Sequence, residues 1–348
     1  MTVHLVSWFH ADVERFKSTY SQTLGDSTSA SHYAVYERCL RVFSASARRW
    51  NPDAVIHLVT NVPAEGIFAP GTIRLFDRLG VRRSVVPNGH ETPPGYYGKW
   101  QNQFYVLDVA RTVLSGPPAP QDDDVVVVLD SDCLVTGAVD ESVTGSAGLA
   151  SLVIPTPPDV QENGVSPRQM GELARVFPGT AWPGSPDGAA PYLGGEVLAA
   201  RVDVLRRILD RGEEIFPWAL ERREADEPSL NEEAHLLSLA VHTLALERED
   251  ASRFIGRLWT QPWKYRTVRP GDERLLVWHL PAEKKTGLLR IDRAVRVGSS
   301  WFWRSDHDSW LRRAGALTGV PRYRPQKVLR DLQDLGGARL RHRLGVGR

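Results

Sequence analysis

The sequence has very little cysteine and no long apolar run. Only Cys39 and Cys133 occur among its 348 residues, and neither belongs to a Cys-x-x-Cys or Cys/His zinc spacing. A disulfide framework and a zinc-finger type of site are therefore excluded. No stretch reaches the length of a membrane span, the first residues lack a secretory pattern, and no Asn-x-Ser/Thr acceptor occurs. These absences lead us to expect a soluble, cytoplasmic protein without a transmembrane segment.

Phosphate-binding glycine motifs and a strong net charge are also missing. No Gly-x-Gly-x-x-Gly follows a predicted strand and no Gly-x-x-x-x-Gly-Lys occurs, which argues against a Rossmann oxidoreductase and a P-loop enzyme. The formal net charge of +1 gives no general attraction to nucleic acid. With 42% hydrophobic and 24% charged residues, the composition is that of an ordinary globular protein.

The most informative stretch is Val125–Val135. Five consecutive apolar residues, four of them valine, predict a strand buried on both faces, and the strand ends in Asp130 and Asp132. In an open α/β sheet, ligands gather at the carboxyl ends of the strands. Two neighbouring carboxylates there favour a hard divalent ion that also binds substrate phosphates. The alternative is that the two aspartates only cap the next turn.

The order of the predicted elements indicates an α/β fold with a mixed, mostly parallel central sheet. We expect strands over residues 3–8, 54–60, 73–76, 125–129, 149–154, 192–198 and 275–280, and helices over 32–49, 99–114, 202–214 and 229–244. Residues 155–187 form a long irregular stretch rich in Pro and Gly, which is typical of a substrate lid.

The predicted organisation is a single domain over residues 1–300, with a nucleotide-binding half (1–140) and an acceptor-binding half (141–300). We expect residues 301–348 to be a C-terminal basic helical extension. Eight basic residues follow Pro321, so a helix that touches anionic lipid is one interpretation. A solvated helix is the other, because Asp331 and Asp334 interrupt the positive charge.

Four further motifs occur in order around the Asp-x-Asp. They are Lys99-Trp100-Gln101, Pro191-Tyr192-Leu193-Gly194-Gly195, Glu233-Ala234-His235-Leu236, and His279 followed by Lys285. Together with the Asp-x-Asp, this set resembles GT-A fold glycosyltransferases of two retaining groups. The first three motifs resemble the histo-blood-group and α1,3-galactosyltransferase family, and the last resembles the His-x-x-Gly-x-x-Lys of glycogenin-like enzymes.

The resemblance implies a site for Mn²⁺ or Mg²⁺ and for the diphosphate of a sugar nucleotide. Asp132 would bind the metal directly, Asp130 would share the metal or face the ribose, and His279 would be a third ligand. Lys285, or its neighbour Lys284, would neutralise the departing diphosphate.

The resemblance also assigns residues to the sugar and the acceptor. Glu233 would lie beneath the anomeric carbon as nucleophile or as a counter-charge, and Glu232 would bind a donor-sugar hydroxyl. Lys99 and Trp8 would contact the donor, whereas Gly194, Gly195 and His235 would belong to the acceptor side. Glu232 stands where the family has Asp. Ala282 replaces the glycine of the His–Lys motif, and Thr286-Gly287 replaces its usual Pro-Trp.

The expected function is a metal-dependent, retaining hexosyltransferase. Its donor would be a nucleoside-diphosphate sugar, with uridine as the expected base, and its acceptor a small molecule, a natural product or a glycan. One alternative is a haloacid-dehalogenase-type phosphohydrolase, with Asp130 as nucleophile and Asp132 as general acid. Another is a protein that binds a sugar nucleotide without turnover.

Overall fold

The computed structural model describes residues 1–18, 26–97, 102–261 and 265–333. Its centre is a seven-stranded sheet in the order β3-β2-β1-β4-β7-β6-β8, and only β7 runs antiparallel to its neighbours. The strands are β1 (Val3–Phe9), β2 (Val55–Thr60), β3 (Arg82–Val85), β4 (Val125–Leu129), β6 (Leu149–Val153), β7 (Leu193–Arg201) and β8 (Glu249–Asp250). The expected α/β class with a mixed, mostly parallel sheet is confirmed.

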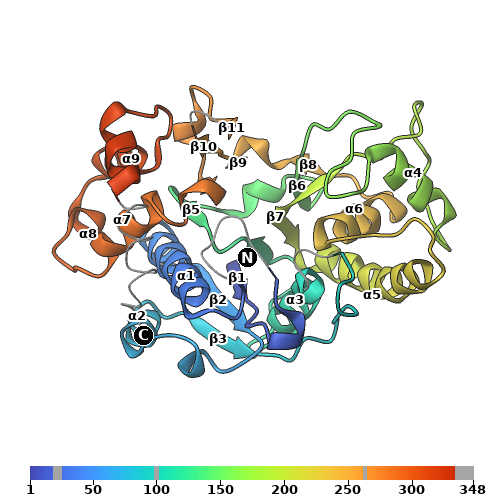
Figure 1. The fold of residues 1–348 in the computed structure, drawn as a ribbon, viewed down its shortest axis with the longest axis horizontal. Coiled ribbons are helices and arrows are strands. Elements are labelled where there is room, and N and C mark those ends of the chain that lie inside the picture. The colour runs from blue at the N-terminus through green and yellow to red at the C-terminus, as the bar shows by residue number, and fades with distance from the viewer. Residues whose placement is uncertain (19–25, 98–101, 262–264, 334–348) are drawn as a thin grey trace.

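Apolar side chains cover both faces of the sheet. In β4 alternate residues enter two cores, Val125, Val127 and Leu129 on one side and Val126 and Val128 on the other. Helices α1 (Ala30–Trp50), α2 (Pro70–Arg78), α7 (Gly287–Val295), α8 (Trp301–Arg304) and α9 (His307–Thr318) contribute to the first core. Helices α3 (Val106–Ser115), α4 (Pro167–Val176), α5 (Val202–Glu224) and α6 (Glu233–Thr243) contribute to the second (Figure 1).

A smaller sheet positions a histidine beside the end of β4. It consists of β5 (Cys133–Val135), β12 (Val277–His279) and β9 (Ile255–Arg257), with β12 in the middle. The antiparallel register pairs His279 with Cys133, the residue after Asp132. A two-stranded ribbon, β10 (Thr260–Gln261) with β11 (Tyr265–Arg266), follows β9. Short 3₁₀ turns occupy Glu14–Phe16, Ala64–Gly66, Gln103–Tyr105, Glu141–Thr144, Ala251–Arg253, Asp272–Arg274 and Pro281–Glu283.

The strand predicted over residues 73–76 is wrong. These residues lie in α2, which begins with Pro70 at its first position and buries Thr72, Leu75 and Phe76 on one face. Four residues are too few to separate a period of 2 from a period of 3.6. The third parallel strand is β3, whose sequence Arg-Arg-Ser-Val gives almost no apolar signal because it lies at the sheet edge.

The stretch 155–187 is not irregular throughout, because it contains α4. Ser166 caps this helix with a reciprocal capping box to Gln169, and Pro167 occupies the first turn. Gly171 suggests a loop in the sequence, but a Cβ at this position would collide with the backbone carbonyl of Gly188. Close packing therefore explains this glycine inside a helix.

Three predicted helices have different bounds in the structure. The helix predicted over 202–214 continues as α5 to Glu224, through Pro217. The helix predicted over 229–244 begins only at Glu233, because Glu232 is extended. The helix predicted over 99–114 begins as α3 at Val106, and residues 98–101 lie outside the described part of the chain.

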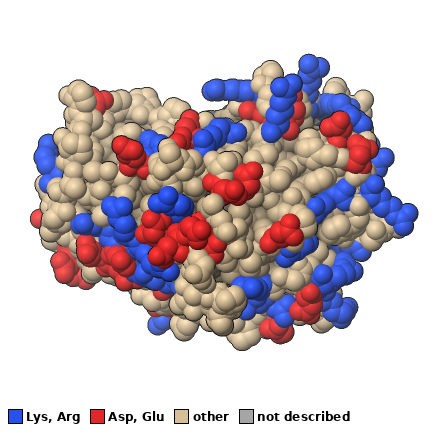
Figure 2. All heavy atoms as spheres, turned by 180° about the vertical axis from the view of Figure 1, so that it is seen from behind, with Lys and Arg blue, Asp and Glu red and all other residues tan. Residues whose placement is uncertain are grey.

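The C-terminal helices are packed into the first core. Phe302 of α8 and Trp310 of α9 are completely buried in the same cluster as α1 and β4. The boundary at residue 300 stays a prediction. Among the described residues, no helix combines the length and the apolar character that a membrane span requires. Acidic and basic side chains are interspersed over the face shown in Figure 2, in keeping with the low net charge.

A buried ion pair joins α1 to α7. Arg41 Nε lies 2.6 Å from Asp292 Oδ1, and Arg41 Nη2 lies 2.9 Å from Asp292 Oδ2. Arg41 also donates to Thr72 of α2 at 2.7 Å. One guanidinium therefore connects three helices of the first core, with Asp292 as its bidentate partner and Glu37 Oε1 3.0 Å from its Nη1.

We predict that Asp292→Ala lowers the free energy of unfolding by about 3 kcal/mol, the lower end for a broken buried ion pair, because the buried guanidinium loses its bidentate partner and keeps Glu37. The matched control is Asp210→Ala, which removes one of the two exposed partners of Arg111 and should cost about 1 kcal/mol or less. Urea unfolding measures both values. Equal losses in the two variants would contradict the structural role of the Arg41–Asp292 pair.

Candidate active site

A cavity of about 390 Å³ lies at the carboxyl ends of β1 and β4. Its walls come from the segments after these strands, from β7, from the start of α6, and from β9, β12 and the turn at Pro281. This is the edge of an α/β sheet where ligands are expected. The cavity is lined by eight residues that the sequence analysis selected: Trp8, Asp130, Asp132, Gly195, Glu232, Glu233, His279 and Lys284.

Asp130, Asp132 and His279 form one group of possible metal ligands. One donor atom of each lies within 4.8 Å of the others. His279 Nε2 is 3.3 Å from Asp130 Oδ2 and 3.5 Å from Asp132 Oδ2. Carboxylate oxygens with one imidazole suit Mg²⁺ or Mn²⁺. The residues present therefore fit a divalent cation.

Electrostatics keep the carboxylate of Asp132 ionised. Burial by itself would raise the pKa of Asp132, but the charges of Lys284 and His279 outweigh burial and hold this pKa well below its usual range. Burial also opposes protonation of His279, yet Asp132 and Asp130 raise its pKa to about 9. The group therefore attracts positive charge, which is the property that a cation site requires.

Lys284 supplies a fixed positive charge next to Asp132. Its Nζ lies 2.6 Å from Asp132 Oδ2 and 5.2 Å from the centre of the Tyr36 ring. Its backbone carbonyl accepts a hydrogen bond from Arg38 Nη1 at 2.9 Å, which fixes the turn to α1. The half-buried Lys285 does not line the cavity. Of the two lysines that the sequence offered, the structure therefore places Lys284 in the site.

Glu233 is the first residue of α6 and faces the same cavity. With its amide nitrogen turned toward α6, Gln103 donates to both carboxylate oxygens, at 2.9 and 2.6 Å. A Cβ on Gly195 would lie 2.6 Å from Glu233 Oε1, so this glycine leaves room for the carboxylate. Burial and the charges of Glu232 and Asp130 raise the pKa of Glu233 well above its usual value. Glu233 is thus a carboxyl group that a nearby positive charge would ionise.

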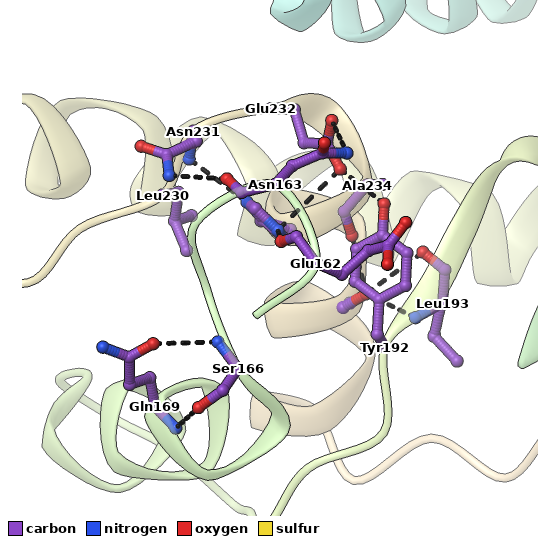
Figure 3. Close-up of polar contacts among 12 residues, drawn as sticks. Glu162, Asn163, Ser166, Gln169, Tyr192, Leu193, Leu230, Asn231, Glu232 and Ala234 are labelled. Atoms are coloured by element: carbon purple, nitrogen blue, oxygen red, sulfur yellow. Dashed lines mark hydrogen bonds and ion pairs between the residues drawn. The ribbon is translucent and has the colours of Figure 1, made fainter. Parts of the chain in front are cut away.

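The neighbouring carboxylate, Glu232, is tied to the cavity wall. Its Oε2 accepts a hydrogen bond from Asn163 Nδ2 at 2.8 Å, and its Oε1 accepts one from the Tyr192 hydroxyl. Asn231 Nδ2 donates to the Asn163 carbonyl at 2.8 Å, so the loop and the start of α6 hold each other (Figure 3). Burial raises the pKa of Glu232. The wall is therefore a hydrogen-bonded unit with Glu232 at its centre.

His235 lies behind this wall and not in the cavity. It is completely buried, its Nδ1 accepts a hydrogen bond from the Asn231 backbone, and its Nε2 is 3.0 Å from the Glu162 carbonyl. Both ring nitrogens are therefore occupied by backbone groups. His235 thus contacts the loop that carries Glu162 from behind the cavity, and its expected place on the acceptor side stays a prediction.

Glu196, which is buried, and Arg257, which is partly exposed, form an ion pair that sequence reasoning missed. Arg257 donates to the two oxygens of Glu196 at 2.8 and 2.7 Å, and both residues line the cavity. A Cβ on Gly194 would collide with the Glu196 carboxylate, so Gly194 serves this packing and does not itself line the cavity. The signal in the sequence was a glutamate directly after a double glycine in a buried strand.

A second missed group follows the end of β1. Asp12 Oδ1 accepts a hydrogen bond from Asn102 Nδ2 at 2.6 Å and lies 2.9 Å from His10 Nδ1. Its Oδ2 is buried and has no hydrogen-bond partner within the described residues, although Asp12 lines the cavity. The polar sequence His-Ala-Asp directly after a buried strand was the available signal.

The two remaining predicted residues are Trp8 and Lys99, and the aromatic side chains of Phe9 and Tyr96 are described with them. Trp8 packs edge-on against Tyr105, with ring centres 5.9 Å apart, and Phe9 lines the cavity as well. The Tyr96 hydroxyl donates to the Leu230 carbonyl at 2.8 Å, away from the cavity lining. Lys99 lies outside the described residues, so its expected donor contact stays a prediction.

The sequence matches no protein-family model and no curated protein. Among solved structures, the chain is similar to the galactosyltransferase LgtC, crystallised in complex with donor and acceptor sugar analogues. The similarity has a TM-score of 0.44 and 16% sequence identity, and it covers 91% of this chain and 97% of LgtC.

We predict that Asp132→Asn weakens Mn²⁺ binding about 100-fold or more. Loss of a residue that only hydrogen-bonds a metal ligand lowers metal affinity by about 10- to 100-fold, and loss of a direct ligand should cost at least as much. Isothermal titration calorimetry measures the affinity. Asp123→Asn, at an exposed position before β4, is the matched control and should bind like the wild type. Thermal unfolding establishes that both variants are folded, and wild-type affinity in Asp132→Asn would contradict the assignment.

Proposed function

We propose that the protein is a metal-dependent, retaining glycosyltransferase of GT-A fold. It would transfer a hexose from a UDP-sugar to a small-molecule, natural-product or glycan acceptor. The observation that supports this proposal is the set of side chains that line one cavity. A possible metal group, a buried lysine beside it and a carboxylate with a raised pKa face the same space at the carboxyl edge of the sheet.

The metal group and Lys284 would receive the diphosphate of the donor. Asp130, Asp132 and His279 would hold Mn²⁺ or Mg²⁺, which when bound acts as a Lewis acid on phosphate oxygens. Lys284 is held in place by Asp132 and by the contact of its carbonyl with Arg38. Negative charge grows on the diphosphate as the glycosidic bond breaks, so a preorganised cation stabilises that stage of the reaction more than the bound donor.

Glu233 would act at the anomeric carbon. As the bond from this carbon to the diphosphate oxygen breaks, positive charge develops on the sugar ring. The ionised Glu233 then either forms a covalent bond to the carbon or serves as its counter-charge. An acceptor hydroxyl completes the transfer, and its proton passes to the departing diphosphate. Gln103 and Gly195 keep the carboxylate in one position for this step.

Asp12 supports uridine as the base of the donor. Asp12 lines the cavity at the end of β1, and its buried Oδ2 is an acceptor without a hydrogen-bond partner among the described residues. The ring N–H of uracil offers a matching donor, as do those of thymine and guanine, whereas cytosine presents an acceptor at this ring position. Unpaired polar groups in a buried site discriminate strongly between such ligands.

The acceptor would approach along the wall formed by Glu162, Asn163 and Tyr192. These residues line the cavity beside Glu232 and Glu233, and the loop is fixed by Asn231 and His235 (Figure 3). The carboxylates, amide and hydroxyl of this wall match the hydroxyl groups of a sugar or a polyhydroxylated natural product.

The direct test is turnover of nucleotide sugars in the presence of Mn²⁺. We expect slow release of UDP from a UDP-hexose without acceptor, loss of this release in EDTA, and much slower release from a CMP-sugar. Coupled detection of the free nucleotide measures the rate. Absence of metal-dependent release from every sugar nucleotide, together with hydrolysis of a simple phosphate ester, would support the phosphohydrolase instead.

We predict that Glu233→Gln lowers kcat for UDP-hexose about 1000-fold or more and leaves UDP affinity within about threefold of wild type, because the amide cannot supply negative charge to the sugar. Steady-state kinetics and calorimetry with UDP give the two values. Glu221→Gln, at an exposed site on α5, is the control. A parallel loss of UDP binding would show that Glu233 is structural.

A further inference from the structure

The turn that carries Lys284 is covered by the end of the described chain. Residues 325–333 are helical, and we call residues 321–333 the C-terminal clasp. Lys327 of the clasp is almost completely buried, and its Nζ donates to Glu283 Oε1 at 3.0 Å and to Oε2 at 2.9 Å. The sequence analysis offered a solvated helix or a lipid-contacting helix for this part of the chain. The burial of Lys327 corrects both interpretations at this residue.

Glu283 is the centre of a saturated hydrogen-bond network. Its Oε2 also accepts from Thr286 Oγ1 at 2.8 Å and from the Gly287 amide at 2.9 Å, while Thr260 donates to Oε1. These bonds close the 283–287 turn upon itself, and the turn leads directly into α7. Every oxygen of Glu283 is thus satisfied, as a carboxylate that is 2% exposed requires.

Lys327 and Arg290 together balance the negative charges of Glu283 and Asp331. Lys327 Nζ also lies 2.6 Å from Asp331 Oδ2 and 4.7 Å from the centre of the Tyr323 ring. Arg290 of α7 pairs with Asp331 at 2.8 Å. Without Lys327, Glu283 would remain buried next to Asp331 with no cation between them, and two like charges in a low-dielectric site repel each other strongly.

Glu283 directly precedes Lys284 in the chain, so a displacement of the Glu283 backbone also moves Lys284. Lys284 Nζ must stay within reach of Asp132 Oδ2, and Pro281 on the same turn lines the cavity. Arg38 holds the turn from the side of α1, and Lys327 holds it from the side of the clasp. The position of the active-site cation is therefore set between two elements far apart in the sequence.

We propose that Lys327 is a positioning residue, and that the C-terminal clasp completes the active site by fixing the turn that presents Lys284 to the donor diphosphate. The expected effect on kcat rests on the proposed function. The expected ordering of the 281–287 turn by the clasp is independent of that function. Loss of the clasp should reduce stabilisation of the leaving diphosphate and leave the binding of the sugar and the base largely intact.

The test compares Lys327→Met with Arg330→Met in the full chain. Both remove one positive charge from the clasp helix, but Arg330 is exposed. In Lys327→Met we expect amide hydrogen exchange over residues 280–290 to rise about tenfold or more. We also expect kcat for UDP-hexose to fall about tenfold or more, with the donor KM within about threefold, because a small displacement of a catalytic group costs rate. Arg330→Met should change neither quantity.

A double variant separates positioning from a general loss of stability. Adding Glu283→Gln to Lys327→Met removes the uncompensated charge, so exchange and kcat should both move back toward wild type. A double variant that remains as impaired as Lys327→Met, whether in folding, exchange or rate, contradicts the proposal.

The single variants test the two parts of the proposal separately. Equal hydrogen exchange in Lys327→Met and Arg330→Met would show that the clasp does not order the turn. Raised exchange in Lys327→Met with unchanged kcat would show that the clasp does not position Lys284. A wild-type protein without nucleotide-sugar turnover refutes the proposed function, while the exchange comparison still decides the clasp.

Discussion

The site depends on the attraction between a buried carboxylate and the positive charges around it. Asp132 is 1% exposed at the end of a strand that is itself buried on both faces. An ionised carboxylate is stable in such a place only with cationic or hydrogen-bonding partners. Lys284 and His279 supply this charge, and each comes from a segment about 150 residues away along the chain. The late strand β12 and the turn after it therefore have to fold against the first half of the protein.

The same constraint explains how the outer elements are arranged. The smaller sheet brings β12 alongside β5, and thereby His279 next to the Asp-x-Asp. Arg38 on α1 and Lys327 near the end of the described chain hold the turn that carries Lys284. The opposite wall is organised by a different network, in which Asn163 contacts Glu232 and Asn231 (Figure 3). His235 contacts the same loop through the Glu162 carbonyl. One cavity thus has a charged side and a hydrogen-bonded side.

Features that depend on local sequence could be predicted. The valine run of β4 required a buried strand, and the two aspartates after it had to lie at the ligand-binding edge of the sheet. The resemblance to known motifs selected Glu233 and His279, which the structure places in the cavity. Edge strand β3 was not predictable, because Arg-Arg-Ser-Val carries no apolar alternation. Helix α2 was mistaken for a strand because its apolar residues span only one turn.

Features that depend on partners distant in the sequence could not be predicted. Nothing near Glu196 identifies Arg257 as its partner, since the two are 61 residues apart and meet only when β7 and β9 fold together. Lys327 lies among arginines that are exposed, and its burial follows from Glu283 and not from its neighbours. His235 matched a family motif, yet only the structure shows that backbone groups occupy both of its nitrogens.

The central claim is that the Asp130–Asp132–His279 group and Lys284 together receive a nucleoside diphosphate with a divalent ion. The most direct measurement is thermal unfolding of the wild-type protein with UDP alone, with Mn²⁺ alone and with both. A ligand at about 100 times its dissociation constant stabilises the folded state by roughly 2.7 kcal/mol, which shifts the melting temperature by several degrees. The account predicts a shift with both that exceeds the sum of the separate shifts. A UDP response that is equal with and without Mn²⁺, or absent in both cases, would contradict it.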